Sequence, residues 1–172
     1  ILAQEGLRKK HPMVFIPGIT STGLEVWQGH ECLRSHFRER IWGGTLMLRK
    51  LLLHNNCWIQ HMLLNETTGL DPQGVRLRPA MGIGAADVLM GAYSLWGTLV
   101  RSLADLGYDA NSIHMAAYDW RLGPWDLERR DRYCTNLKLS IELMYEVNER
   151  EGAVIAVHSM GANVLQYFLH WV

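Results

Sequence analysis

The chain has 172 residues, 48% of them hydrophobic, and its 17 Lys and Arg residues balance its 17 Asp and Glu residues. This length suits one domain that buries about two thirds of its unfolded surface. The neutral balance and the lack of a basic cluster argue against a nucleic-acid partner, and no uncharged apolar run of about 18 residues predicts a membrane-spanning helix.

The first predicted element is a buried strand at residues 13–16, which ends at Pro17-Gly18. A loop after an early strand can supply one of the two N–H donors that stabilise the oxyanion of an acyl-transfer intermediate. The backbone of Ile19, or of a near neighbour, is the candidate donor. An ordinary turn at the end of a strand explains the same residues.

Residues 21–64 form an irregular excursion in which Trp27, Trp42 and Trp58 are scattered among arginines and a leucine run at 51–53. Long segments without a regular pattern are more often functional than decorative. Apolar and basic side chains together suit contact with a lipid surface. We therefore predict a lid or cap here; an insertion that only completes the core is the alternative.

Cys32 and Cys57 lie within this excursion. In an oxidising compartment, a disulfide between them would close a loop of about 25 residues and contribute about 3 kcal/mol to stability; in the cytosol both would be buried thiols. The three cysteines, with Cys134 expected in the core, do not have the spacing of a metal site. Asn65-Glu66-Thr67 is an N-glycosylation acceptor if the chain enters the secretory pathway.

The middle of the chain is predicted to alternate strands and helices. The expected elements are strands at residues 58–64, 75–78 and 113–118 and helices at 87–106 and 126–150. Asp119 follows the last of these strands and stands two residues before Arg121, which favours a structural ion pair over a catalytic acid.

The C-terminal stretch has the pattern of a nucleophile elbow. A short apolar strand at residues 153–157 leads into Ser159, and an apolar helix is expected at 163–172. Such a turn strains the serine backbone, lifts the hydroxyl clear of the sheet and points the next N–H at the oxyanion. Gly161 fits a position without room for a side chain, whereas Val157 departs from the G-x-S-x-G pattern. A strand-to-helix turn without chemistry is the alternative.

The alternation of strands and helices predicts a mostly parallel sheet with right-handed crossovers. Together with the elbow and the loop after the first strand, it predicts an α/β-hydrolase fold. All 172 residues are expected to form the N-terminal part of one such domain, with a lid or membrane-contact excursion at about 21–64.

Several motifs resemble the lecithin:cholesterol acyltransferase family, and among its members the phospholipid:diacylglycerol acyltransferase branch. They are the His11-Pro12 to Pro17-Gly18 segment, Cys57-Trp58, residues 68–72, Tyr118-Asp119-Trp120-Arg121 and His158-Ser159-Met160-Gly161. The resemblance implies transfer of a fatty acyl group from a phospholipid to diacylglycerol, which yields triacylglycerol and a lysophospholipid. A sterol is the alternative acceptor.

By position, the resemblance makes Ser159 the nucleophile and the amides of Ile19 and Met160 the oxyanion donors. It also matches Cys32 and Cys57 to the pair that borders the lid, and Trp42 to a lid aromatic. The acceptor asparagine resembles a glycosylated position, which implies a lumenal face of the endoplasmic reticulum membrane with an anchor before Ile1. No metal or nucleotide cofactor is expected, because the donor ester already stores the energy for transfer.

A serine hydroxyl is a weak nucleophile without a base, and in this fold the acid and histidine follow the serine. No acidic residue and only one histidine, His170, follow Ser159; His170 and His158 are both expected to be structural. We therefore expect the Asp and His beyond Val172, and near inactivity of this segment alone. The alternatives are a phospholipase or lipase that uses water as acceptor, and a non-catalytic fragment that binds lipid interfaces.

Overall fold

The computed structural model describes residues 6–172 except 87, 90–92 and 95. Its centre is a three-stranded parallel sheet in the order β7-β1-β8, formed by β7 (Ile113–Met115), β1 (Met13–Ile16) and β8 (Val154–Val157). Met13 pairs with both Ile113 and Val154, so β1 is the central strand. The strands predicted at residues 13–16 and 153–157 are confirmed, and the one predicted at 113–118 is confirmed only over Ile113–Met115.

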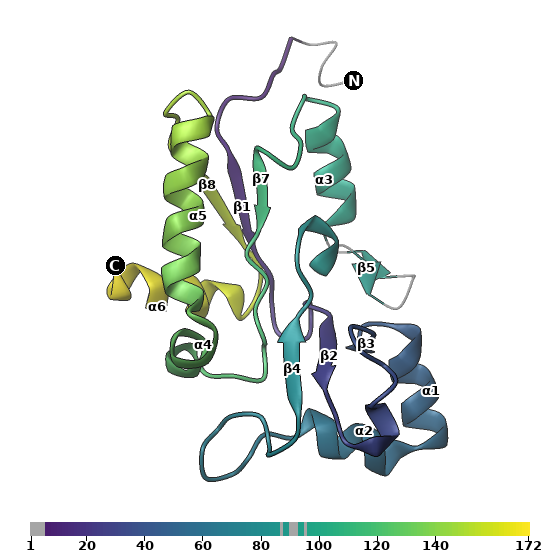
Figure 1. Cartoon of the computed structure of the whole chain (residues 1–172). Helices are drawn as coiled ribbons and strands as arrows, with labels where there is room; N and C mark the ends of the chain where they lie inside the picture. The colour runs from purple at the N-terminus through teal and green to yellow at the C-terminus, as the bar shows by residue number, and fades with distance from the viewer. Residues whose placement is uncertain (1–5, 87, 90–92, 95) are drawn as a thin grey trace.

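Helices cover both faces of this sheet (Figure 1). Successive side chains of β1 point to opposite faces, so its apolar residues pack against helices on both sides. Phe15 packs with Trp96 and with the side of α3 (Gly97–Ala104), whereas Val14 and Ile16 face α5 (Tyr133–Val147) and α6 (Gly161–Trp171). The short helix α4 (Pro124–Asp131) precedes α5. The result is a mixed α/β arrangement that is compatible with an α/β-hydrolase fold.

The excursion folds into a second body, which is drawn below the parallel sheet in Figure 1. An antiparallel sheet in the order β3-β2-β4 comprises β3 (Arg40–Trp42), β2 (Leu24–Gln28) and β4 (Arg76–Pro79). Two helices, α1 (Thr45–Leu53) and α2 (Asn55–Met62), cover it. Leu24, Leu33 and Ile41 are fully buried in a core of their own, so this segment contributes a packed core, and its role as a lid stays a prediction.

Three other predicted elements were wrong in type or extent. Residues 58–64 were expected to be a strand, but Trp58–Met62 belong to α2, because the buried Cys57 and His61 are four residues apart on one helical face. The helix expected over 87–106 is confirmed only as α3. Residues 88–89 and 93–94 instead pair as the two-stranded antiparallel sheet β5 (Val88–Leu89) and β6 (Tyr93–Ser94), and the rest of 87–95 lies outside the described residues.

The long helix expected at 126–150 is divided in two. Arg132 has a left-handed backbone, with a φ of 55°, and ends α4 before α5 begins. A continuous helix requires a negative φ at every residue, so the apolar stripe persisted across a break that periodicity cannot reveal. Short 3-10 turns at Glu31–Leu33 and Ile83–Ala85 complete the described elements, and no helix among them has the length and apolar character needed to cross a membrane.

Candidate active site

Ser159 lies in a strained turn between β8 and α6. Its φ is 52°, a left-handed conformation that non-glycine residues rarely adopt and that is typical of functional turns. The amide of Gly161 donates to the carbonyl of His158 at 2.9 Å, and the amide of Ala162 donates to that of Ser159 at 3.0 Å, which closes the turn. The side chain of Ser159 is exposed. The strand, turn and helix around this serine therefore have the predicted geometry.

Two glycines allow the turn to pack against the end of β1. A Cβ at Gly161 would lie 2.5 Å from the carbonyl oxygen of Ile16 and 2.7 Å from that of Pro17, which are backbone atoms that cannot rotate away. A Cβ at Gly18 would lie 2.9 Å from the Cβ of Ser159. The predicted lack of room at Gly161 is confirmed. The role of Gly18 was not predicted, although the Pro17-Gly18 pair marked the loop.

The loop of residues 17–22 therefore reaches the serine. Among the described residues, the amides of Ile19 and Met160 donate no intramolecular hydrogen bond, and they belong to the two segments that meet at Ser159. An oxyanion hole requires two N–H donors near the attacking hydroxyl, and these two amides are the candidates. The structure thus brings together Ser159, the loop of Ile19 and Met160, while their catalytic roles stay predictions.

The two histidines after residue 150 do not activate the serine in this structure. The ring of His158 lies beside Gly18 and meets the edge of Trp96 at 6.4 Å between ring centroids. His170 lies in the last turn of α6 and is exposed. Neither ring hydrogen-bonds to Ser159 within the described part of the chain.

Trp42 and the two cysteines lie in the second body. Trp42, in β3, packs against Trp120 at 5.0 Å and against Trp58 at 6.2 Å between ring centroids, and its side chain is half-buried. Cys32 and Cys57 are joined by a disulfide across 25 residues. Cys134 is a buried free thiol whose pKa is raised to about 11 by burial, as a core position requires.

His61 lies beside the disulfide, and the three side chains are close enough to hold a metal ion. The sulfur atoms are bonded to each other, however, and both ring nitrogens of His61 are occupied. Nε2 accepts a hydrogen bond from the amide of His30 at 3.0 Å and therefore carries no proton. The ring proton is on Nδ1, which donates to the carbonyl of Cys57 at 2.7 Å. Burial lowers the pKa of His61, so the ring is neutral and structural.

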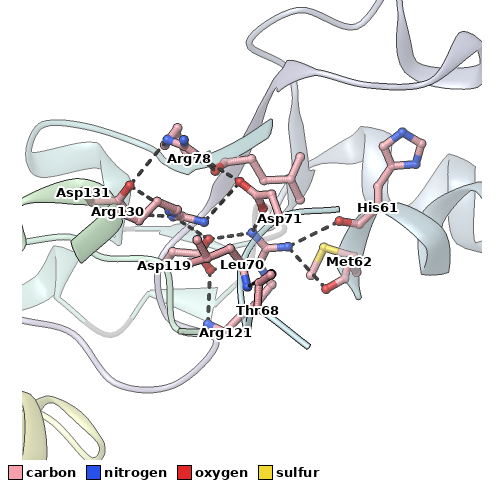
Figure 2. A network of polar contacts seen from close by, with 11 residues as sticks. His61, Met62, Thr68, Leu70, Asp71, Arg78, Asp119, Arg121, Arg130 and Asp131 are labelled. Carbon is pink, nitrogen blue, oxygen red and sulfur yellow. Dashed lines mark hydrogen bonds and ion pairs between the residues drawn. The ribbon is translucent and has the colours of Figure 1, made fainter. Parts of the chain in front are cut away.

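A cluster of six charged side chains joins the two bodies, as Figure 2 shows. Its members are Asp71, Arg78, Asp119, Arg121, Arg130 and Asp131. Asp119 is fully buried and lies 2.6 Å from Nη2 of Arg121 and 2.9 Å from Nη2 of Arg130. Burial alone would raise the pKa of Asp119, but these two guanidinium groups hold it below its usual value. Asp119 is thus a structural ion-pair partner, as predicted.

Asp71 extends the cluster and was not predicted. It accepts from Arg121 at 2.9 Å and from Arg78 at 2.7 Å, which ties the loop after α2 to β4. These partners are 50 and 7 residues away in sequence, so no local spacing reveals the set. A hollow of about 770 Å³ lies between the end of β4, β7 and α5; Arg78, Arg130 and Asp131 of the cluster line it, whereas Ser159 and Ile19 do not.

The parallel sheet and the strained turn at Ser159 define a mixed α/β protein that is compatible with an α/β-hydrolase fold. The particular family follows from comparison. The family model for lecithin:cholesterol acyltransferase matches residues 36–172, and the chain belongs to this family.

Relatives place the chain near one branch of the family. It is 45% identical over 171 residues to phospholipid:diacylglycerol acyltransferase 1 of Arabidopsis thaliana, and 42% identical over 176 residues to phospholipid:diacylglycerol acyltransferase of Saccharomyces cerevisiae. The identity to phosphatidylcholine-sterol acyltransferase of Homo sapiens is 28% over 176 residues. These matches cover 99%, 100% and 92% of the chain, but only 25%, 26% and 38% of the relatives. The chain therefore spans about a quarter of the length of its more similar relatives.

Proposed function

We propose that this chain is the nucleophile-bearing part of an α/β-hydrolase-fold O-acyltransferase that moves a fatty acyl group from a phospholipid to diacylglycerol. The observation that carries the proposal is the strained, exposed Ser159 facing a loop with a free amide at Ile19. Sequence identity of 42–45% to proteins named phospholipid:diacylglycerol acyltransferases supports the proposed donor and acceptor.

The reaction proceeds through an ester on Ser159. The hydroxyl oxygen attacks the carbonyl carbon of the phospholipid ester while its proton passes to a base. The developing oxyanion accepts hydrogen bonds from the N–H groups of Ile19 and Met160. Collapse expels the lysophospholipid alcohol, which takes up the proton. The hydroxyl group of diacylglycerol then attacks the acyl-serine while its proton passes to the base, and triacylglycerol leaves as the oxygen of Ser159 takes up that proton.

The base and its acidic partner are proposed to lie outside these 172 residues. Residues 160–172 contain no Asp or Glu, and His170 is remote from the serine turn. The relatives have about three quarters of their length outside the matched segment, which leaves room for both groups. This chain then forms the N-terminal part of one catalytic domain.

A lipid surface is the proposed site of action, and α1 with α2 supplies the contact. Five apolar side chains of these helices are exposed: Leu48, Leu51, Leu52, Leu53 and Ile59. Leu52 is 80% and Leu53 68% exposed, which is costly in water and favourable at a lipid interface. The disulfide and the exposed Asn65 support a lumenal, oxidising location at the endoplasmic reticulum membrane.

The test uses the natural protein that contains this chain, with phospholipid labelled in its acyl group and diacylglycerol in vesicles. Ser159→Ala should lower triacylglycerol formation by about 10⁴-fold or more, because the nucleophile is lost. Ser102→Ala, which removes an exposed hydroxyl in α3, is the control and should keep full activity.

The product distinguishes the alternatives. Labelled free fatty acid in place of triacylglycerol would assign a phospholipase or lipase on the same framework. Vesicle binding without any Ser159-dependent product would leave a non-catalytic interface protein and contradict the proposal.

A further inference from the structure

The loop of residues 17–22 has a conformation that its own sequence does not favour. Thr20 has a φ of 60°, although a β-branched residue rarely adopts a left-handed backbone. Gly18 is pressed against Ser159. A strained loop at a functional site needs contacts that hold it in place.

Three aromatic side chains from distant segments provide these contacts, each as a donor to a loop carbonyl. The hydroxyl of Tyr118 donates to Pro17 at 2.8 Å, Nε1 of Trp42 to Thr20 at 2.8 Å, and Nε1 of Trp120 to Thr22 at 3.1 Å. Each donor is 22 to 101 residues away from its acceptor. The loop is therefore held from outside.

The bond from Trp42 differs from the other two because it starts a chain of bonds that ends at Ile19. The carbonyl of Thr20 and the amide of Ser21 belong to one peptide group, and this amide donates to the carbonyl of Gly18 at 3.2 Å. The carbonyl of Gly18 shares its peptide group with the amide of Ile19. Successive hydrogen bonds through planar peptides orient and polarise one another.

We propose that Trp42 is a positioning residue for the oxyanion hole. Its indole N–H, acting through the peptides of Thr20-Ser21 and Gly18-Ile19, orients the amide of Ile19 toward the oxyanion and strengthens it as a donor. This inference rests on the proposed function. It gives the second body a direct part in catalysis, since Trp42 belongs to β3 and packs on Trp58 of α2.

Trp42→Phe in the natural protein that contains this chain tests the inference, because it keeps an aromatic ring and removes the N–H. The rate constant for covalent labelling of Ser159 by a soluble p-nitrophenyl phosphonate should fall about 3- to 10-fold, as the loss of one hydrogen bond in the transition state predicts. In acyl transfer, kcat should fall by a similar factor while KM is unchanged.

Trp58→Phe is the matched control. Its Nε1 donates to the carbonyl of Ile41 at 3.0 Å in the same aromatic cluster, outside the peptide chain that leads to Ile19. Both substitutions replace an indole with a phenyl ring and remove one hydrogen bond, so they should lower the thermal midpoint alike. Only Trp42→Phe should slow the labelling.

Equal labelling rates for the two variants would overturn the positioning role and leave Trp42 as a packing residue. If the unmodified protein itself is not labelled at Ser159, the proposed function fails. If it is labelled and Trp42→Phe reacts as fast, only the inference fails.

Discussion

The turn at Ser159 and the charge cluster around Asp119 are both strained or costly arrangements, and they are held in opposite ways. At the turn, constraint comes from the backbone: Ser159 has a positive φ, and Gly161 and Gly18 allow main chains to touch. At the cluster, constraint comes from side chains, with Asp119 fully buried between two guanidinium groups.

The turn therefore fixes the geometry of Ser159, whereas the charge cluster holds distant segments of the fold together. A turn that is held by its backbone can leave its side chain exposed, and so accessible to a substrate. The buried charge cluster joins three segments, namely the loop after α2, strand β4 and helix α4, through partners such as Asp71 and Arg130. Substitutions in the two regions should therefore separate loss of stability from loss of reactivity.

The largest effect on stability is expected from Asp119→Ala. It leaves Arg121 and Arg130 buried without their shared partner, which should lower the free energy of unfolding by about 3–5 kcal/mol. Denaturant unfolding measures the change. Asp126→Ala, which breaks the more exposed pair with Arg129, should cost less than about 1 kcal/mol. Similar costs for the two variants would mean that the cluster does not join the bodies.

Compared with Asp119→Ala, Gly161→Ala should have a smaller effect on stability and a larger effect on the reactivity of Ser159. The added Cβ meets backbone oxygens of Ile16 and Pro17, which should cost about 1–3 kcal/mol and move Ser159 away from Ile19. Phosphonate labelling of the folded protein should fall below a tenth of its original rate. Gly152→Ala at the other end of β8, where a Cβ meets nothing within 4 Å, should label normally; an unimpaired Gly161→Ala would refute backbone control of the turn.

The smallest effect is a pH dependence of stability in the second body. Burial lowers the pKa of His61 in the folded protein, opposed by its bond to Cys57, while the unfolded chain has the usual value near 6.5. The contribution of the neutral ring to the free energy of unfolding is thus complete above pH 6.5, and it is lost as the pH falls from 6.5 through the lowered pKa of the folded state. The thermal midpoint should drop between pH 7.5 and 5.5.

His61→Gln should flatten that drop, whereas substitution of the exposed His54 should not. Part of the slope will remain in His61→Gln, because burial also lowers the pKa of His114. A slope unchanged by His61→Gln would show that the ring is not buried neutral beside the disulfide.

The same contrast explains what the sequence could reveal. The elbow is a local pattern, since an apolar strand, a serine and a glycine two residues later occur within ten positions, and the structure placed them as predicted at β8, Ser159 and Gly161. The central strand β1 was also predicted from a local pattern, the apolar residues 13–16 followed by Pro17-Gly18. The family resemblance was confirmed by the match over residues 36–172.

The parts that were missed depend on distant partners. The strand expected at 58–64 is a helix because Cys57 and His61 face a core made by β2 and β3. The break at Arg132 is a single backbone angle. The bonds of Trp42 and Tyr118 to the loop of residues 17–22 span 22 and 101 residues, and no periodicity within the chain encodes them.

The position of β1 sets an order of assembly during synthesis. Met13 must wait for Ile113 and Val154, which emerge 100 and 141 residues later; at about 5–20 residues per second the second delay is about 7–28 s. The disulfide between Cys32 and Cys57 closes within 25 residues. The second body is therefore complete long before the strand that leads to Ser159 leaves the ribosome, and the serine turn is among the last parts of this chain to acquire its shape.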